Sequence, residues 1–471
     1  MNIGQPTTYW EVGMDATSLV SAWNSIVLQL CYIFTEPSAK TWQQIVLGWV
    51  LRRGPMTVTG IVRTLGDLVD RHWTVYEKFF YRTRWSLKEL SVALLTHVIY
   101  PMILESGVLD EFTTKPVADM AIDDTTVARC GRHVAHAGWF KDASTSDSSH
   151  KGTVIHWAHN WIVGAITIRL PRWSMIRWVL PAVFTLYRKR SDCKGEDMFR
   201  SRQELAGEMI QTAAQALPGV QLRVSADGQY AKRQVVQPLP QNVNLVSRIR
   251  RDAAIYELPP KRRPKSKRGR KPKKGKRLPC PRKIAAYRKK GFKKITVYKQ
   301  GYQVQRLVLG ITCLWYHVCR DVPIRMVIVR DPAGKERDDF FFCTDATVPD
   351  AEIVQRYYDR WGVEEAIMES KQHMGFESTQ GWCSKTVNRQ APLAMVLLTL
   401  VKAWYARCAI AEPSLLPETM PWYTHKRHPS FVDMLSALRK VLWQHRISPN
   451  FRFSPRVKEL IETVSYGLFA A

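Results

Sequence analysis

Four residues in the C-terminal third of the chain have types and a spacing that suit phosphate chemistry. At about 100° per residue, a helix would place them within an arc of about 60°, away from the neighbouring Glu365. A carboxylate on this face can bind Mg²⁺, and a phenol, a guanidinium and an ammonium can each hold a phosphate oxygen. A solvated polar face is the alternative interpretation. The four residues are Tyr357, Arg360, Glu364 and Lys371.

Two further acids end segments with the pattern of β-strands. Residues 117–126 run from apolar residues into acids and threonines, and residues 220–228 alternate polar and apolar residues up to Asp227. Taken singly, such an aspartate is more typical of a turn or a helix cap. Taken with the helical glutamate, they predict three converging carboxylates. Two divalent ions about 3.5–4 Å apart would relieve the repulsion, and oxygen ligands favour Mg²⁺ or Mn²⁺ over zinc.

The order of these motifs resembles DDE transposases of the bacterial insertion-sequence type. The segment from Tyr357 to Lys371 matches their signature Y-x-x-R-x-x-x-E-x-x-x-x-x-x-K. The string AIDDTT at 121–126 is similar to the end of their first core strand. The resemblance implies Asp124 as the first catalytic aspartate, ahead of Asp123, because the family's residue directly precedes a pair of threonines.

The resemblance also assigns the remaining site residues. It implies Asp227 as the second catalytic acid and Glu364 as the third, whereas Asp119 lies too early in its strand. All three catalytic acids, Asp124 included, would be ligands of two Mg²⁺ or Mn²⁺ ions, with Asp124 bridging them. The residues that the resemblance implies for DNA binding are Tyr357, Arg360, Lys371, Arg248 and Arg250.

The resemblance implies an α/β fold with an RNase H-like (retroviral integrase-like) catalytic core. A β-rich insertion would interrupt this core, and helical domains would flank it. The expected division is a helical DNA-binding domain at 1–115, the first part of the core at 116–240, the insertion at 241–338, the last core strand and catalytic helix at 339–375, and a helical dimerisation region at 376–471.

The activity that the resemblance implies is cut-and-paste transposition. The protein would cleave double-stranded DNA at terminal inverted repeats and transfer the ends into target DNA, as a homodimer in a synaptic complex. One alternative is a DNA-binding protein derived from a transposase that has lost catalysis, but intact acids argue against it. The other is an RNase H-like nuclease without strand transfer.

Other residues of the expected insertion have two interpretations each. Arg248 and Arg250 alternate with Ile249, so they share a strand face that could meet DNA or simply be exposed. Trp315 and Tyr316 could trap a flipped base, as aromatic residues do in some relatives, although apolar strand aromatics more often belong to the core.

The charge of the chain points to a polyanionic partner. Lys and Arg number 70 against 41 Asp and Glu, which gives a net charge of +29. A folded protein this basic commonly meets nucleic acid. The run at 261–277 holds 12 Lys or Arg in 17 residues, too polar to build a core. We expect this loop to contact phosphates or to be a solvated arm.

The remaining patterns favour a cytoplasmic protein, and the resemblance implies association with the bacterial nucleoid. No signal peptide is predicted, and arginines interrupt the longest apolar stretch, so no membrane partner is expected. The nine cysteines form no C-x-x-C pair, which fits a reducing compartment and gives no support for structural zinc. We interpret a group of four histidines as structural or DNA-facing: His133, His136, His156 and His159.

Overall fold

The computed structural model describes most of the chain. Of the predicted basic loop at 261–277, residues 261–271 lie outside the described part. The description covers residues 16–447, apart from residue 112 and the segments 142–153, 174–175, 194–198, 261–271, 418–425 and 427.

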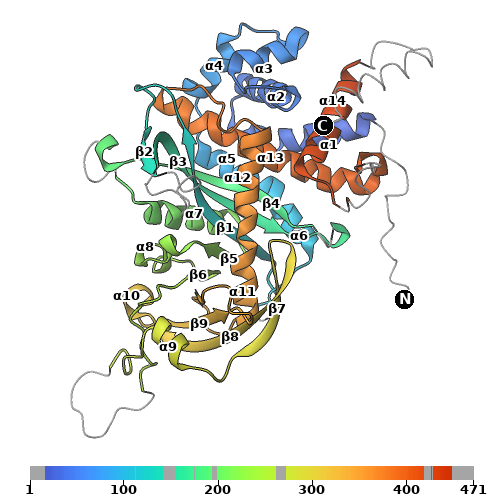
Figure 1. Ribbon diagram of the computed structural model, residues 1–471. Helices are drawn as coiled ribbons and strands as arrows, with labels where there is room; N and C mark the ends of the chain where they lie inside the picture. Colours follow the sequence, from blue (N-terminus) through green and yellow to red (C-terminus); the bar gives the residue numbers. More distant parts are fainter. Residues whose placement is uncertain are drawn as a thin grey trace, which may run out of the picture.

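A ten-stranded mixed sheet forms the centre of this part of the chain (Figure 1). The strands are β1 (Val117–Ala128), β2 (Gly138–Lys141), β3 (Ile155–Ile168), β4 (Trp178–Tyr187), β5 (Gln221–Ala226), β6 (Val243–Arg248), β7 (Lys293–Lys299), β8 (Tyr302–Leu314), β9 (Pro323–Arg330) and β10 (Asp339–Cys343). Their order is β2-β3-β1-β5-β6-β10-β9-β8-β7, and β4 pairs with β3 beside this path.

Strand directions divide the sheet into two parts. β1, β5 and β6 are parallel, while β3 is antiparallel to both β1 and β4. β10 then runs antiparallel to β6, and β9, β8 and β7 follow as an antiparallel meander. The β-rich segment predicted as an insertion therefore extends the central sheet. The predicted insertion, which begins at residue 241, also contains β6. This strand pairs with β5 and belongs to the parallel part of the sheet.

The strand β3 is longer than the sequence pattern predicts. The apolar patterns at 153–157 and 161–170 predict two strands, but a single long strand, β3, spans most of this region. Both β3 and β4 are buried almost throughout and are rich in Val, Ile and Trp, which is typical of strands covered on both faces.

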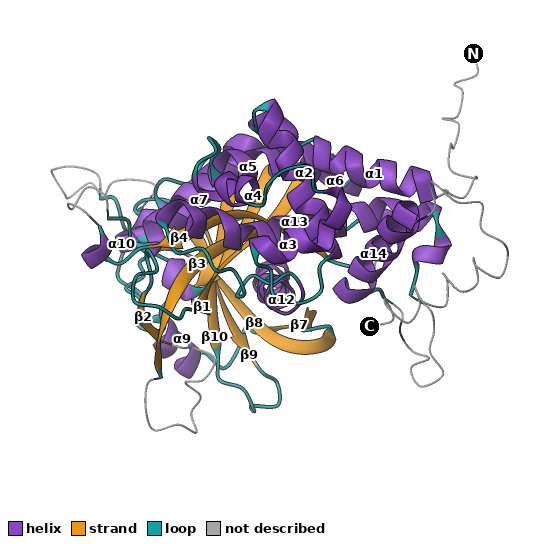
Figure 2. Cartoon of the chain, turned by 90° about the horizontal axis from the view of Figure 1, so that it is seen from above, coloured by secondary structure: helices purple, strands orange, loops and turns teal. Residues whose placement is uncertain are grey.

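Helices from both ends of the chain pack together on one side of the sheet (Figure 2). Trp49 Nε1 donates to the Met374 carbonyl at 2.9 Å, and Trp404 Nε1 donates to the Leu19 carbonyl at 3.0 Å. The helices predicted as separate N- and C-terminal regions thus share one packed layer. They are α1 (Ala16–Leu28), α2 (Glu36–Leu51), α3 (Val58–Leu65), α4 (Thr74–Tyr81), α5 (Leu87–Ala93), α6 (Tyr100–Ser106), α13 (Ser384–Ala411) and α14 (Phe431–Ile447).

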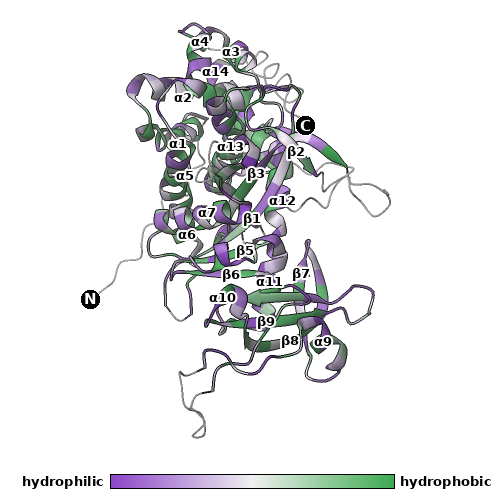
Figure 3. Cartoon of the chain, turned by 90° about the vertical axis from the view of Figure 1, so that its left-hand side faces the viewer, coloured by the Kyte–Doolittle hydropathy of each residue, from purple (hydrophilic) through white to green (hydrophobic). Residues whose placement is uncertain are grey.

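The central helix of this layer is α13. Both α13 and the segment Leu87–Ser106 are long and apolar enough to cross a membrane, judged by length and composition alone. However, 89% of the most apolar window of α13 is buried inside the protein, as in the core helix of a soluble protein. Most of its residues from Val387 to Ala409 are buried, and Figure 3 shows the helix coloured largely as hydrophobic.

The helices that flank the sheet elsewhere are α7 (Arg202–Ala216), α8 (Arg233–Val236), α9 (Pro281–Tyr287), α10 (Tyr316–Cys319), α11 (Asp350–Asp359) and α12 (Trp361–His373). A Ser201–Glu204 capping box begins α7. The segment 349–371, whose pattern predicts a helix, forms α11 and α12, which meet at Arg360.

Candidate active site

Two aspartates lie on neighbouring central strands of the sheet, at the level where β5 ends. The parallel register pairs Ile122 with Ala226, the last residue of β5, so Asp123 on β1 lies level with Asp227, which directly follows β5. Successive strand side chains alternate between faces. The Ser225 hydroxyl donates to the Arg356 carbonyl of α11 at 3.1 Å, which identifies the face shared with Asp227 as the one that α11 covers.

The junction of α11 and α12 brings three residues of the predicted helical face to these aspartates. Arg360 donates from Nη1 to Asp123 Oδ2 at 2.6 Å and from Nη2 to Glu364 Oε1 at 2.8 Å. The Tyr357 hydroxyl donates to Asp227 Oδ1 at 3.2 Å. Arg360 therefore bridges two carboxylates, and Tyr357, whose ring lies 5.5 Å from the Arg360 guanidinium, contacts the third.

Burial and charge act against each other in this cluster. Burial raises the pKa of Asp123, and Glu364 adds to the rise, while Arg360 counteracts it. Burial also disfavours the charged guanidinium of Arg360, but Asp123, Tyr357 and Glu364 outweigh burial and raise its pKa. Burial raises the pKa of Tyr357 to about 12, so this phenol remains a hydrogen-bond donor at neutral pH. A positive charge between the acids is thus what allows them to lie close together.

The donor set suits a hard divalent cation. Asp123, Asp227 and Glu364 offer carboxylate oxygens, which are the ligands that Mg²⁺ and Mn²⁺ prefer. The guanidinium of Arg360 already lies between Asp123 and Glu364 as a cation. In the described residues, no group of three His, Cys, Asp or Glu side chains is arranged around a common metal position. Binding of an ion by all three acids would therefore require their side chains to rearrange, with Arg360 giving up its contacts to two of them.

The structure does not bring Asp124 to this cluster. Its side chain points to the opposite face of β1, where Asn160 Nδ2 donates to Oδ2 at 2.9 Å and Tyr230 donates to Oδ1 at 3.3 Å. Gln229 Nε2 also donates to Oδ1, and Arg202 Nε lies 3.7 Å from Oδ2. Because neighbouring residues of a strand face opposite sides, Asp123 and Asp124 cannot both reach α12.

The other residue of the predicted helical face lies at the far end of α12. Lys371 Nζ donates to the Thr126 carbonyl at 2.9 Å and lies 2.8 Å from Glu377 Oε1. It fastens α12 to the end of β1. Glu365 lies off this helical face, near Arg177, as the sequence predicted. Burial raises the pKa of its carboxyl group, and Arg177 opposes the rise.

The two predicted basic residues after β5 have different surroundings. Arg248 is half-exposed, lies 3.3 Å from Asp339 and stacks over the Tyr357 ring at 5.3 Å, which places it beside the carboxylate cluster. Arg250 is exposed and forms a two-pronged ion pair with Asp252. The expectation that both share one face ends with the strand, since β6 stops at Arg248.

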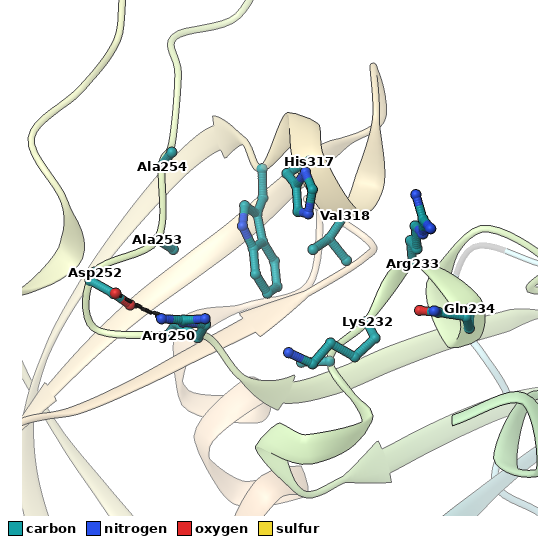
Figure 4. Close-up of a pocket in the computed structure, with 11 residues that line it drawn as sticks. Lys232, Arg233, Gln234, Arg250, Asp252, Ala253, Ala254, His317 and Val318 are labelled. Carbon is teal, nitrogen blue, oxygen red and sulfur yellow. Dashed lines mark hydrogen bonds and ion pairs between the residues drawn. The ribbon is translucent and has the colours of Figure 1, made fainter. Parts of the chain in front are cut away.

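Arg250 lines a separate pocket of about 530 Å³ between α8, α10 and the segment after β6 (Figure 4). Trp315 forms one wall, is buried and packs edge-on against Phe342. Its burial fits the core interpretation of this tryptophan. Tyr316 lies outside the pocket lining, with Lys274 over its ring at 5.1 Å.

Two of the four predicted histidines hold loops together. His159 accepts a hydrogen bond from Arg129 Nε at 3.0 Å and donates from Nε2 to the Ala135 carbonyl at 2.8 Å. Burial lowers the pKa of His159 to about 4, so its ring is neutral. His136 contacts Ser384 at 2.7 Å. The sequence offered no signal for the Arg129 contact, because its partners lie far away in the chain.

Comparison with known proteins gave a family match and a structural likeness. A family model described as DDE superfamily endonuclease matches residues 29–303, which include Asp123 and Asp227 but end before Glu364. No curated protein matches the chain. A solved structure of the piggyBac transposase synaptic complex with hairpin DNA has 10% sequence identity and a TM-score of 0.40, and the alignment covers 96% of this chain and 85% of that chain.

Proposed function

Because the chain belongs to the DDE superfamily endonucleases, we propose that it is a DNA transposase of the insertion-sequence type. It would cleave double-stranded DNA at the inverted repeats of its own element and transfer the ends into target DNA. The observation that carries this proposal is the convergence of Asp123, Asp227 and Glu364 around one arginine and one tyrosine.

We assign the first catalytic position to Asp123, in the place that the resemblance gave to Asp124. Asp123 shares a face with Asp227 and a guanidinium with Glu364. Asp124 is already satisfied by hydrogen-bond donors from Asn160 and two other side chains. A ligand for a catalytic ion must turn toward the other acids, and only Asp123 does so.

The core topology supports an RNase H-like assignment. Within the sheet, β4-β3-β1-β5-β6 form a run in which the first three strands are antiparallel and the last three are parallel. This run places one acid on β1 and one directly after β5, as expected for the predicted core. The third acid comes from α12, which contacts β1.

The three acids would hold the divalent ions, which when bound supply an activated oxygen nucleophile and stabilise the leaving oxygen. The remaining side chains orient the DNA. Arg248 and Arg360 flank the Tyr357 ring at 5.3 Å and 5.5 Å, so both guanidiniums can turn to a phosphate near the acids. Lys371 would hold a second phosphate where α12 meets the end of β1.

A homodimer would bring two element ends together, and in a bacterial cell the protein would act at the nucleoid. The two alternative functions would give different DNA products. A nuclease without strand transfer would release cut ends that never join the target. A catalytically inactive relative would bind the ends and cut nothing.

Cleavage of a plasmid that carries the gene's own flanking sequences tests the proposal. We expect cutting at the element's ends with Mg²⁺, none with EDTA and none by Asp227→Asn. Glu364→Gln should lose cutting by at least about 1,000-fold. Its matched control, Glu365→Gln, lies off the helical face and should stay within about fivefold of wild type. Equal losses from both glutamates, or cutting without metal, would contradict the proposal.

A further inference from the structure

Arg360 is the buried cation of the carboxylate cluster, and its hydrogen bonding is incomplete. Its side chain is 12% exposed, and its two terminal nitrogens donate to Asp123 at 2.6 Å and to Glu364 at 2.8 Å. Its third nitrogen, Nε, is buried and has no hydrogen-bond partner in the described part of the chain. A buried donor without a partner raises the free energy of the folded state. The two carboxylates thus hold the guanidinium in a position that leaves Nε unsatisfied.

The guanidinium occupies carboxylate oxygens that a divalent ion would need. Asp123 has two oxygens: Oδ1 accepts from the Asp124 amide at 2.9 Å, and Oδ2 accepts from Arg360. Mg²⁺ takes oxygen ligands at about 2.0–2.1 Å, and two cations on one carboxylate repel each other. Arg360 and an ion therefore compete for Asp123 and Glu364.

The surroundings of Arg360 allow it to reach another anion. The Tyr357 ring is stacked on Phe341, with 4.3 Å between the ring centroids. The guanidiniums of Arg360 and Arg248 lie 5.5 Å and 5.3 Å from this ring. The side chains of Glu364 and Arg248 are 30% and 50% exposed, so the cluster is open to a ligand beside them. Arg360 can turn to an anion there while the Tyr357 ring stays in place.

We propose that Arg360 couples the binding of divalent ions to the binding of DNA at this site. In the free protein, its guanidinium neutralises Asp123 and Glu364 and thereby weakens their affinity for an ion. A DNA phosphate offers the guanidinium a bidentate anionic partner. Once Arg360 turns to this phosphate, both carboxylates are released as metal ligands. The coupling is reciprocal, so bound ions also raise the affinity for DNA.

The coupling controls when the acids take up metal, which is separate from the choice of substrate. It rests on the proposed function for the source of the phosphate. The competition between Arg360 and an ion, in contrast, is a property of the free protein. The competition can therefore be tested with metal alone, and the effect of DNA can be tested afterwards.

Binding of Mn²⁺ in the absence of DNA tests the competition. The full-length wild type and Arg360→Gln are titrated, and free Mn²⁺ is measured by electron paramagnetic resonance. We expect the Kd of Arg360→Gln to be at least about tenfold lower, since a unit positive charge next to two ligands is removed. Asp227→Asn should bind Mn²⁺ at least about tenfold more weakly, which identifies the site. Equal affinities of wild type and Arg360→Gln would overturn the proposal.

Arg248→Gln is the matched control for this titration. It removes the same charge beside the Tyr357 ring, from a residue that pairs with Asp339. Its Kd should stay within about threefold of wild type, and a tightening equal to that of Arg360→Gln would overturn the proposal. Arg360→Lys is a second test variant that keeps the charge for folding. Its ammonium lacks the planar fork that reaches both acids, so its Kd should fall at least about threefold.

The same titration in the presence of DNA tests the coupling. A random-sequence 20-base-pair duplex is added, and the Mn²⁺ that the duplex holds by itself is subtracted. DNA should tighten Mn²⁺ binding at least about fivefold more for the wild type than for Arg360→Gln, in which the acids are already released. Equal gains would overturn the coupling. Tighter Mn²⁺ binding by Arg360→Gln without any plasmid cleavage by the wild type would instead remove the proposed function and leave the competition standing.

Discussion

Asp123 and Asp124 are neighbours in the chain with different surroundings. Asp123 shares Arg360 with Glu364, while Asp124 accepts hydrogen bonds beneath α7 and lies 3.7 Å from Arg202. Arg202 in turn stacks over the Tyr187 ring at 4.4 Å. This second network joins α7 to β1 on the face away from the catalytic cluster. We therefore interpret Asp124 as a residue that stabilises the core.

This interpretation predicts a stability change. Asp124→Asn removes the negative charge opposite Arg202, so the free energy of unfolding should fall by about 1–3 kcal/mol. Urea denaturation followed by tryptophan fluorescence measures this loss. The control is Asp252→Asn, since Asp252 pairs with Arg250 at 2.8 Å and both side chains are exposed; this exposed pair should contribute far less to stability. Unchanged stability of Asp124→Asn would contradict a structural role.

The sequence carried part of the information needed to separate these two aspartates. Strand alternation alone places Asp119 and Asp123 on one face, and Met120 and Ile122 with Asp124 on the other. It could not say which face meets the catalytic helix, because both faces of β1 are covered. The contact of α12 with β1 joins residues more than 200 positions apart, and spacing in the sequence does not encode it.

The end of β1 and the loop after α12 are joined through Arg129. Its Nη1 donates to the Thr379 carbonyl at 2.8 Å and to the Glu377 carbonyl at 3.1 Å, while Nε donates to His159. Glu377 also contacts Lys371 of α12, so this network links α12 to the end of β1. The neutral form of His159 is required, because the protonated ring could not accept from Arg129.

A pH dependence follows from this requirement. Burial lowers the folded-state pKa of His159 to about 4, with nearby Arg129 and His136 acting in the same direction and Asp192 against them. The stabilisation is complete above the unfolded pKa near 6.5 and is lost as the pH falls toward 4. We expect a loss of about 2–3 kcal/mol between pH 7.5 and 4.5.

Urea unfolding at both pH values checks this prediction. His159→Gln should be less stable at pH 7.5 and should lose less stability on acidification than the wild type. His156→Gln is the matched control on the same strand and should keep the wild-type pH dependence. Identical pH profiles for wild type and His159→Gln would contradict the assignment.

Local pattern predicted the helical segment that carries Tyr357 and Glu364 and the strands that lead to the first two acids. The boundaries between the expected domains were harder to predict. The helices at the two ends of the chain pack against each other, and the β-rich segment continues the core sheet through the pairing of β10 with β6. Both outcomes depend on long-range pairing between elements, which local composition does not specify.

Arg389 of α13 connects these two helical regions. It donates from Nη1 to the Thr83 carbonyl at 2.8 Å and the Phe80 carbonyl at 3.1 Å, and it lies over the Trp85 ring at 4.6 Å. Its removal would leave carbonyls at the end of α4 without a charged donor. Arg389→Ala should lower the free energy of unfolding by about 2–4 kcal/mol, as measured by urea denaturation.

The control for this prediction is Lys385→Ala, an exposed residue on the first turn of the same helix. It should change stability by less than about 0.5 kcal/mol. A small effect of both variants would mean that the terminal helices are held by apolar packing alone.

Cleavage by the two neighbouring aspartate variants tests the site most directly. Wild type, Asp123→Asn, Asp124→Asn and Asp227→Asn would be incubated with Mg²⁺ and the element's own ends, with rates corrected for the folded fraction. We expect Asp123→Asn to match Asp227→Asn, at least about 1,000-fold below wild type, and Asp124→Asn to stay within about tenfold of wild type. Active Asp123→Asn together with inactive, folded Asp124→Asn would contradict the assignment of the catalytic carboxylates.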